Sequence, residues 1–87
     1  MPEVNADPEK LRQFAKALSA SSQQFDQLAR SLQRSLDATN WKDSERQRFE
    51  SDFKQTLKTI SQFSERLRSQ YVPQLQKKAE ALDRFRS

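Results

Sequence analysis

Residues 37–44 read DATNWKDS, and this short stretch separates two long segments in which apolar residues recur every three or four positions. Apolar residues with that spacing lie on one face of an α-helix. Thr39 and Asn40 are poor residues for a helix interior, and Asn40 is the best candidate for a left-handed backbone conformation because the chain has no glycine. The stretch also holds the only tryptophan, Trp41. It is therefore predicted to be a turn between two helices.

The segment before the turn is predicted to form a helix from about residue 8 to about residue 38. Asp7 can accept hydrogen bonds from free backbone N–H groups at the start of this helix, and Pro8 suits its first position. Ser21 or Ser22 falls where the stripe would be expected to hold an apolar residue, and a small residue there would let another helix approach closely. The stripe consists of Leu11, Phe14, Leu18, Phe25, Leu28, Leu32 and Leu36.

The segment after the turn is predicted to form a second helix from about residue 44 to about residue 84, capped by Asp43 or Ser44. Pro73 has no backbone N–H and crowds the preceding turn, so a kink or a break is expected near it. Ala79 continues the apolar face beyond Pro73. The stripe of this helix consists of Phe49, Phe53, Leu57, Ile60, Phe63, Leu67, Tyr71, Leu75, Leu82 and Phe85.

These patterns predict one all-α domain over residues 1–87, an antiparallel helical hairpin whose helices are joined by a loop at residues 39–43. A single hairpin leaves part of each apolar stripe in water. A second hairpin is therefore expected to pack against the first, which would give a four-helix bundle dimer. The residues predicted to form the core of the hairpin or of the dimer are Leu11, Phe14, Leu18, Phe25, Leu28, Leu32, Phe53, Leu57, Ile60, Phe63, Leu67 and Tyr71.

The composition argues against several classes of function. The chain has no histidine, the usual general base near neutral pH and a common zinc ligand, and no cysteine, so thiolate chemistry is excluded. Without glycine it cannot contain a P-loop, a dinucleotide-binding fingerprint or a nucleophile elbow. We therefore expect no enzyme activity and no catalytic, cofactor or metal site. No apolar run approaches the roughly 20 residues that a membrane span needs, and residues 1–6 are expected to be a tail, not a cleavable signal peptide.

The net charge of +4 comes entirely from the second half of the chain. Residues 1–40 carry five basic and five acidic side chains, whereas residues 41–87 carry eleven basic and seven acidic ones. Lys77-Lys78 is the one basic doublet, and acidic residues are interspersed throughout. A solvated helix surface of mixed charge explains this pattern. The alternative is a basic surface that binds nucleic acid or another acidic partner, although no nucleic-acid partner is expected.

Trp41-Lys42-Asp43 lies between two helices of similar predicted length, and Phe49 follows Trp41 by eight residues. In these features, over nearly the whole chain, the sequence resembles the WXG family, the ESAT-like small helical hairpins of type VII secretion systems. The resemblance implies a hairpin that dimerises with itself or with a related hairpin protein. It implies secretion by a route independent of a signal peptide, or a cytoplasmic adaptor or chaperone role before export. It also implies that Trp41 and Phe49 form a tip recognised by a secretion ATPase or a secreted substrate.

Two positions depart from the pattern of that family. Asp43 stands where the family has glycine, although an aspartate can cap the following helix. Tyr71 is followed four residues later by Leu75, not by the acidic residue that completes the family's C-terminal export signal. A needle-like or chaperone hairpin outside type VII secretion stays open as an alternative. It also stays open whether Trp41 only covers the end of the hairpin or presents a recognition surface.

Overall fold

The computed structural model describes residues 6–86 of the chain, and every regular element among them is helical. The elements are α1 (Pro8–Asp37), α2 (Ser44–Arg66), a π-helical turn η1 (Leu67–Tyr71) and α3 (Val72–Arg86). The described residues contain no strand, so the all-α prediction is confirmed. The tail expected at residues 1–6 lies outside the described residues, apart from Ala6.

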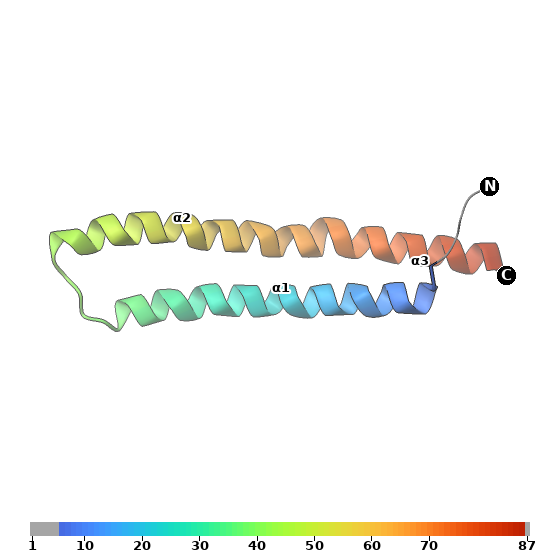
Figure 1. Cartoon of the computed structure of the whole chain (residues 1–87), viewed down its shortest axis with the longest axis horizontal. Coiled ribbons are helices and arrows are strands. Elements are labelled where there is room, and N and C mark those ends of the chain that lie inside the picture. Colours follow the sequence, from blue (N-terminus) through green and yellow to red (C-terminus); the bar gives the residue numbers. More distant parts are fainter. Residues whose placement is uncertain (1–5, 87) are drawn as a thin grey trace.

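The chain folds into a helical hairpin shaped like a rod. α1 runs antiparallel to the continuous rod formed by α2, η1 and α3, and the turn joins the two at one end (Figure 1). The principal extents are 65 × 21 × 15 Å, and the radius of gyration is 19.4 Å. A compact domain of this length has a radius of gyration of about 12 Å. The hairpin is therefore one helical rod long, two helices wide and one layer thick, with no globular interior.

The two halves of the hairpin meet along small side chains that recur every seventh residue. In α1 the buried residues are Pro8, Ala15, Ser22, Ala29 and Leu36. Opposite them, Leu57, Ser64, Val72 and Ala79 are buried with the same spacing, apart from one extra residue between Ser64 and Val72, and Leu67 and Leu82 are buried three positions after Ser64 and Ala79. A seven-residue repeat keeps one edge of each helix facing its partner, as in coiled coils. Because most of these side chains are small, the helices can approach closely along this line, which we call the seam.

The large apolar residues predicted as core lie mostly beside the seam. Of the twelve, Leu57 and Leu67 are buried, whereas Leu11, Leu18, Phe25, Leu32, Phe53 and Ile60 are only partly buried. Four are exposed in the hairpin, namely Phe14, Leu28, Phe63 and Tyr71. These four therefore do not belong to the core of a single hairpin. The reason is geometric, since each apolar stripe is wider than the line of contact between two helices, and the small residues at one edge of the stripe make that contact.

Capping side chains and one left-handed residue define the ends of the helices, as their residue types predict. The Oδ1 atom of Asp7 accepts a hydrogen bond of 2.9 Å from the N–H of Glu9 at the start of α1. Asn40, in the turn, has a φ angle of 58°, which confirms the left-handed conformation predicted for it. Asp43 is the N-cap of α2, one of the two candidates for that role.

Pro73 lies just after a π-helical turn, and the chain stays helical through it. The N–H of Val72 donates to the carbonyl of Leu67, five residues earlier, so η1 holds one residue more than an α-helical turn. The irregularity expected near Pro73 therefore takes the form of an inserted residue, and no break separates η1 from α3. The insertion is also visible in the seam, because the buried residues Ser64 and Val72 are eight positions apart.

Candidate interaction surface

Large apolar side chains gather on one side of the seam, on a surface that we call the apolar face. On α1 they occupy positions three residues after each seam residue, or one residue before it. The same two positions on α2, η1 and α3 continue the face, because antiparallel helices turn the same edge to the same side. The face consists of Leu11, Phe14, Leu18, Phe25, Leu28, Leu32, Phe49, Phe53, Ile60, Phe63, Leu67, Tyr71, Leu75, Leu82 and Phe85.

Ring contacts show that this face spans both halves of the hairpin. Phe25 of α1 and Phe63 of α2 meet edge to face, with ring centroids 5.5 Å apart and planes at 82°. Nearer the start of α2, the rings of Phe49 and Phe53 stack with centroids 5.4 Å apart. Trp41 of the turn lies 5.4 Å from Phe49. The aromatic surface therefore extends from the middle of the hairpin to its tip.

Six large residues of this face are exposed, from 38 % for Tyr71 to 80 % for Phe85. The other four are Phe14, Leu28, Phe49 and Phe63. The chain as a whole exposes 6981 Å². A globular monomer of its mass, 10.2 kDa, would expose about 5,300 Å², which is about 1,700 Å² less than the whole chain exposes. A cluster of exposed large apolar side chains, like the six on this face, is typical of an interaction site.

At the tip, the turn is held by the side chain of Asp43. Its Oδ1 atom accepts hydrogen bonds from the backbone N–H groups of Glu45 and Arg46, at 3.0 and 3.3 Å. The same oxygen accepts a bond of 2.7 Å from the indole Nε1 of Trp41. One carboxylate therefore caps α2 and orients the indole. The two predicted tip residues, Trp41 and Phe49, are in contact, and Trp41 is partly buried while Phe49 is exposed.

Arg46 ties the tip to both helices. Its guanidinium donates to the carbonyl of Trp41 at 2.9 Å and to the carboxylates of Asp37 and Glu50 at 3.0 and 2.8 Å. Gln33 of α1 also donates to Glu50, at 3.2 Å. The bonds from Arg46 and Gln33 lower the pKa of Glu50 below its ordinary value. The tip therefore has a defined shape although no glycine forms its turn.

The opposite side of the seam is polar, and its centre is a network that joins α1 to α2 and η1. Ser22 and Ser64 are fully buried, with hydroxyl oxygens 2.7 Å apart. Arg68 donates to the hydroxyls of Ser22 and Ser64, at 2.5 and 3.0 Å, and to the carboxylate of Asp26, at 2.8 Å. The hydroxyl of Ser64 and the guanidinium of Arg68 lower the pKa of Asp26 below its ordinary value. The network satisfies the polar groups that the seam buries.

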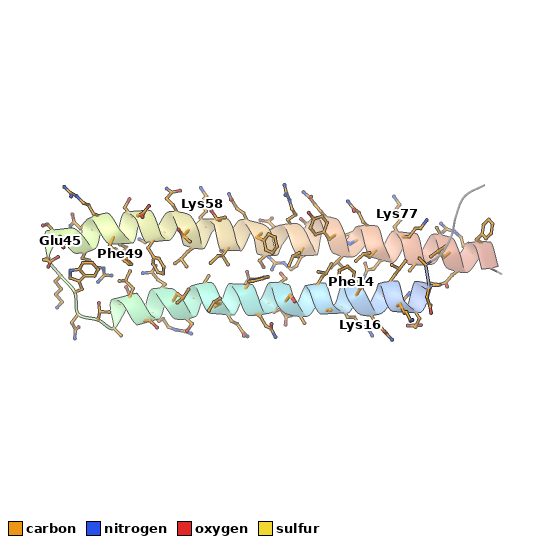
Figure 2. All side chains as sticks on the ribbon, viewed as in Figure 1. Phe14, Lys16, Glu45, Phe49, Lys58 and Lys77 are labelled. Carbon is orange, nitrogen blue, oxygen red and sulfur yellow. The ribbon has the colours of Figure 1, made fainter. Side chains whose placement is uncertain are left out.

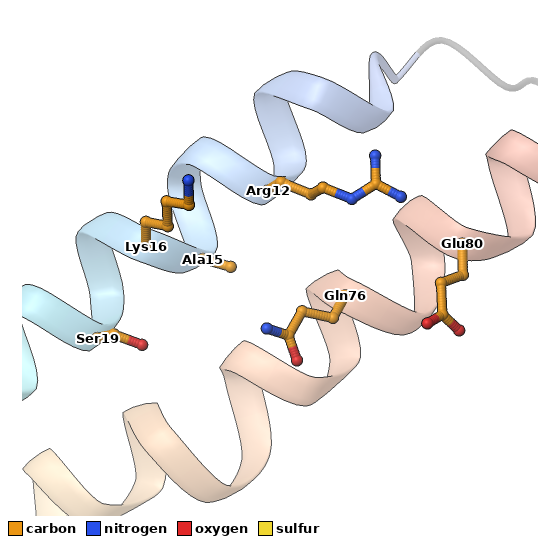
Figure 3. Close-up of a pocket in the computed structure, with 6 residues that line it drawn as sticks. All are labelled: Arg12, Ala15, Lys16, Ser19, Gln76 and Glu80. Atoms are coloured by element: carbon orange, nitrogen blue, oxygen red, sulfur yellow. The ribbon is translucent and has the colours of Figure 1, made fainter.

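Near the open end of the hairpin, the polar side carries an ion pair and a shallow hollow. Arg12 of α1 pairs with Asp83 of α3. Beside this pair, a hollow of about 520 Å³ lies between α1 and α3 (Figure 3). Its lining mixes charges of both signs and consists of Arg12, Ala15, Lys16, Ser19, Gln76 and Glu80.

Figure 2 shows Lys16, Lys58 and Lys77 pointing outward from the hairpin, whereas Phe14 points toward the opposite helix.

Among residues 6–86, no group of acidic side chains is arranged to hold a metal ion. None of the helices in that part of the chain is both long and apolar enough to cross a membrane. The stripes of large apolar residues in the sequence do not include several small residues of the seam, such as Ala15, Ala29 and Ser64. A signal for them exists, because Ala15, Ser22 and Ala29 recur at intervals of seven.

No protein-family model, no curated protein and no solved structure matches this chain.

Proposed function

We propose that this chain is a non-enzymatic interaction protein that pairs with a second copy of itself through the apolar face, forming a four-helix bundle. The observation that carries the proposal is the exposure of six large apolar side chains on one side of the hairpin. Between residues 11 and 36 and between residues 49 and 75, the helix positions of this face hold no charged residue. An uncharged, aromatic-rich surface is typical of the buried centre of a protein interface.

The available area supports a dimer. A Phe or Tyr side chain presents about 150–250 Å², so the six exposed residues, each about half exposed on average, offer roughly 600 Å² in one hairpin. Two copies together would bury roughly 1,200 Å² from these residues alone, which reaches the lower limit for a stable interface. The partly buried residues of the face, such as Leu18 and Ile60, would add to this area.

The arrangement of the two sides favours a closed dimer over a polymer. The apolar residues lie on one side of the seam, whereas the other side carries the pairs Arg12–Asp83 and Arg68–Asp26. An open filament needs a second apolar patch that matches the first. Two hairpins that cover each other's apolar face leave only polar surfaces outward. Concentration-dependent filaments, in place of a closed dimer, would favour the needle-like alternative.

We further propose that this dimer belongs to the WXG type and is exported by, or serves as an adaptor or chaperone for, a type VII secretion system. The support is the resemblance carried by Trp41-Lys42-Asp43 and Phe49. The contacts of Asp43 add to it, because they provide a compact turn in which aspartate replaces glycine. In this proposal the protein acts after signal-peptide-independent secretion, or in the cytoplasm before export.

The dimer is tested by analytical ultracentrifugation across micromolar concentrations, with helicity followed by circular dichroism. The wild-type chain should sediment at twice its monomer mass. Phe63→Lys, which places a charge in the middle of the apolar face, should shift the equilibrium to monomer. The matched control is Gln55→Lys on the exposed outer side of α2, which should leave the dimer intact. A fully helical wild-type monomer at all these concentrations would contradict the proposed pairing.

Export is tested separately, in a bacterium with an active type VII system that expresses the chain. The wild-type protein should appear in the culture medium, and Trp41→Ala should reduce its secretion while the dimer persists. Equal secretion of the two proteins would remove the recognition role of Trp41. Retention of the wild-type protein in the cell would remove the export role but leave the adaptor role and the dimer.

A further inference from the structure

The π-helical turn η1 (Leu67–Tyr71) changes which residue faces α1. In α2 the seam residues Leu57 and Ser64 are seven positions apart, and regular spacing would place Tyr71 next at the seam. The extra residue in η1 instead brings Val72 to the seam, where it is buried, and the seven-residue spacing resumes from there to Ala79. A tyrosine would not fit between helices that approach on alanine and serine.

As a consequence, Tyr71 stands at the apolar face and not inside the seam. Its side chain is 38 % exposed. Beside it the surface forms an apolar hollow of about 310 Å³ between α1 and the η1–α3 segment, lined by Phe14, Leu18, Leu67, Tyr71, Gln74 and Leu75. We call this hollow the socket. None of its lining residues is charged, and five of the six are apolar or aromatic. π-Helical turns within α-helices often occur at functional sites.

We infer that the socket is the main anchoring site of self-association, and that it receives an apolar side chain from the second copy of the chain. This inference rests on the proposed dimer. The socket lies within the apolar face, so its occupant must come from whatever covers that face. A second copy supplies suitable side chains, because the same face presents the protruding residues Leu28, Phe49 and Phe63. In a two-fold dimer each copy both offers a side chain and receives one.

The chemistry of the socket matches this kind of occupant. Side chains that insert into holes between neighbouring helices hold coiled-coil bundles together. In most interfaces a few aromatic anchors in well-packed pockets carry most of the binding energy. Phe14 and Tyr71 border the socket from opposite halves of the hairpin, so an inserted side chain would contact both halves. The extra residue of η1 thus serves association, since it moves the tyrosine from the seam to the mouth of the socket.

The first test fills the socket. Leu75→Trp places a larger side chain in the hollow and should weaken self-association at least tenfold in sedimentation equilibrium, with unchanged helicity at the same temperature. Gln55→Trp, on the exposed outer side of α2, is the matched control and should keep the wild-type dissociation constant. Equal dissociation constants for the two variants would overturn the inference and leave the dimer in place. A wild-type chain that never dimerises would instead overturn the proposed function.

The second test reads burial at the socket directly and does not depend on how Leu75→Trp folds. In a Trp41→Phe background, Tyr71→Trp places the only indole at the mouth of the socket. Its emission should shift to shorter wavelength as the protein concentration rises through the dimerisation range. Gln55→Trp in the same background should show constant emission. Constant emission from position 71, while sedimentation shows a dimer, would place the interface elsewhere on the hairpin.

Discussion

Ser22 and Ser64 meet in the middle of the seam with their hydroxyl oxygens 2.7 Å apart, and each hydroxyl also lies within hydrogen-bond distance of the other residue's carbonyl oxygen, at 3.1 and 2.9 Å. Both residues are fully buried. Serine is small enough to let two helices come this close, and its hydroxyl can bond to the opposite helix. The pair therefore fixes the distance between the helices and also their register along the rod.

The seam predicts a strong size dependence at position 22. Ser22→Leu should lower the free energy of unfolding by about 1–3 kcal/mol, because a larger side chain forces the helices apart. Ser22→Ala should cost about 1 kcal/mol through the lost hydrogen bonds. Urea denaturation followed by circular dichroism measures both changes. Ser31→Leu, at an exposed position of the same helix, is the control, and equal stability of the two leucine variants would contradict a close seam.

Asp43 is expected to act on both the helix and the indole. Asp43→Ala removes the cap of α2, which should cost about 1 kcal/mol of unfolding free energy, and it removes the acceptor of the Trp41 indole. Asp43→Asn keeps a side-chain oxygen and should stay close to the wild type. Thermal melts and Trp41 fluorescence report the two effects separately. If the alanine and asparagine variants had the same emission spectrum, the indole bond would not orient Trp41.

Acid should weaken the hairpin in a defined pH range. Asp26 and Glu50 have pKa values below their ordinary values of 3.8 and 4.5, so their ionised forms stabilise the fold. The folded state therefore gains this stability above the ordinary pKa values and loses it as pH falls through and below them. Melting temperatures should be level at higher pH and fall below about pH 4.5. The variant with Asp26→Asn and Glu50→Gln should melt lower at pH 7 and show a flatter acid profile, whereas a parallel profile would exclude these two carboxylates as the cause.

The extra residue of η1 predicts an asymmetry between two deletions. Removal of Gln70, an exposed residue of η1, would bring Val72 and Ala79 to seven-residue spacing from Ser64, so the hairpin should keep its helicity and thermal stability. Removal of Gln27, an exposed residue of α1, would shift Ala29 off the seam and should lower the melting temperature markedly. Circular dichroism melts of both variants give the comparison. Equal losses would show that the seam spacing does not govern stability.

The turn could be predicted from the sequence because its conformation depends on residues close together in the chain. Asn40 is the residue best able to adopt positive φ in a chain without glycine, and it does so. Asp7 and Asp43 cap the helices that follow them because a carboxylate one or two residues ahead of a helix reaches its free N–H groups. Contacts of this kind span two or three residues, so the local sequence contains all the participants.

The apolar stripes could also be predicted from the sequence. Which edge of each stripe contacts the other helix could not be predicted. Helical spacing shows that Phe14, Ala15 and Leu18 share one face, and it predicts the large residues of that face as the core. In the hairpin, Ala15 is buried and Phe14 is exposed. The close approach of two helices selects the small residues, and that selection depends on both helices at once.

The sequence by itself determined two amphipathic helices, their caps and a tight turn around Trp41, because these depend on residue types within a few positions of one another. Only the tertiary structure decided that Ser22 opposes Ser64 and that Arg46 joins Asp37 to Glu50. It also decided that the extra residue before Pro73 is absorbed in η1, which turns Tyr71 outward. The physical reason is that register and facing are set by pairing between residues far apart in the chain, 42 positions at Ser22 and Ser64 and 71 positions at Arg12 and Asp83.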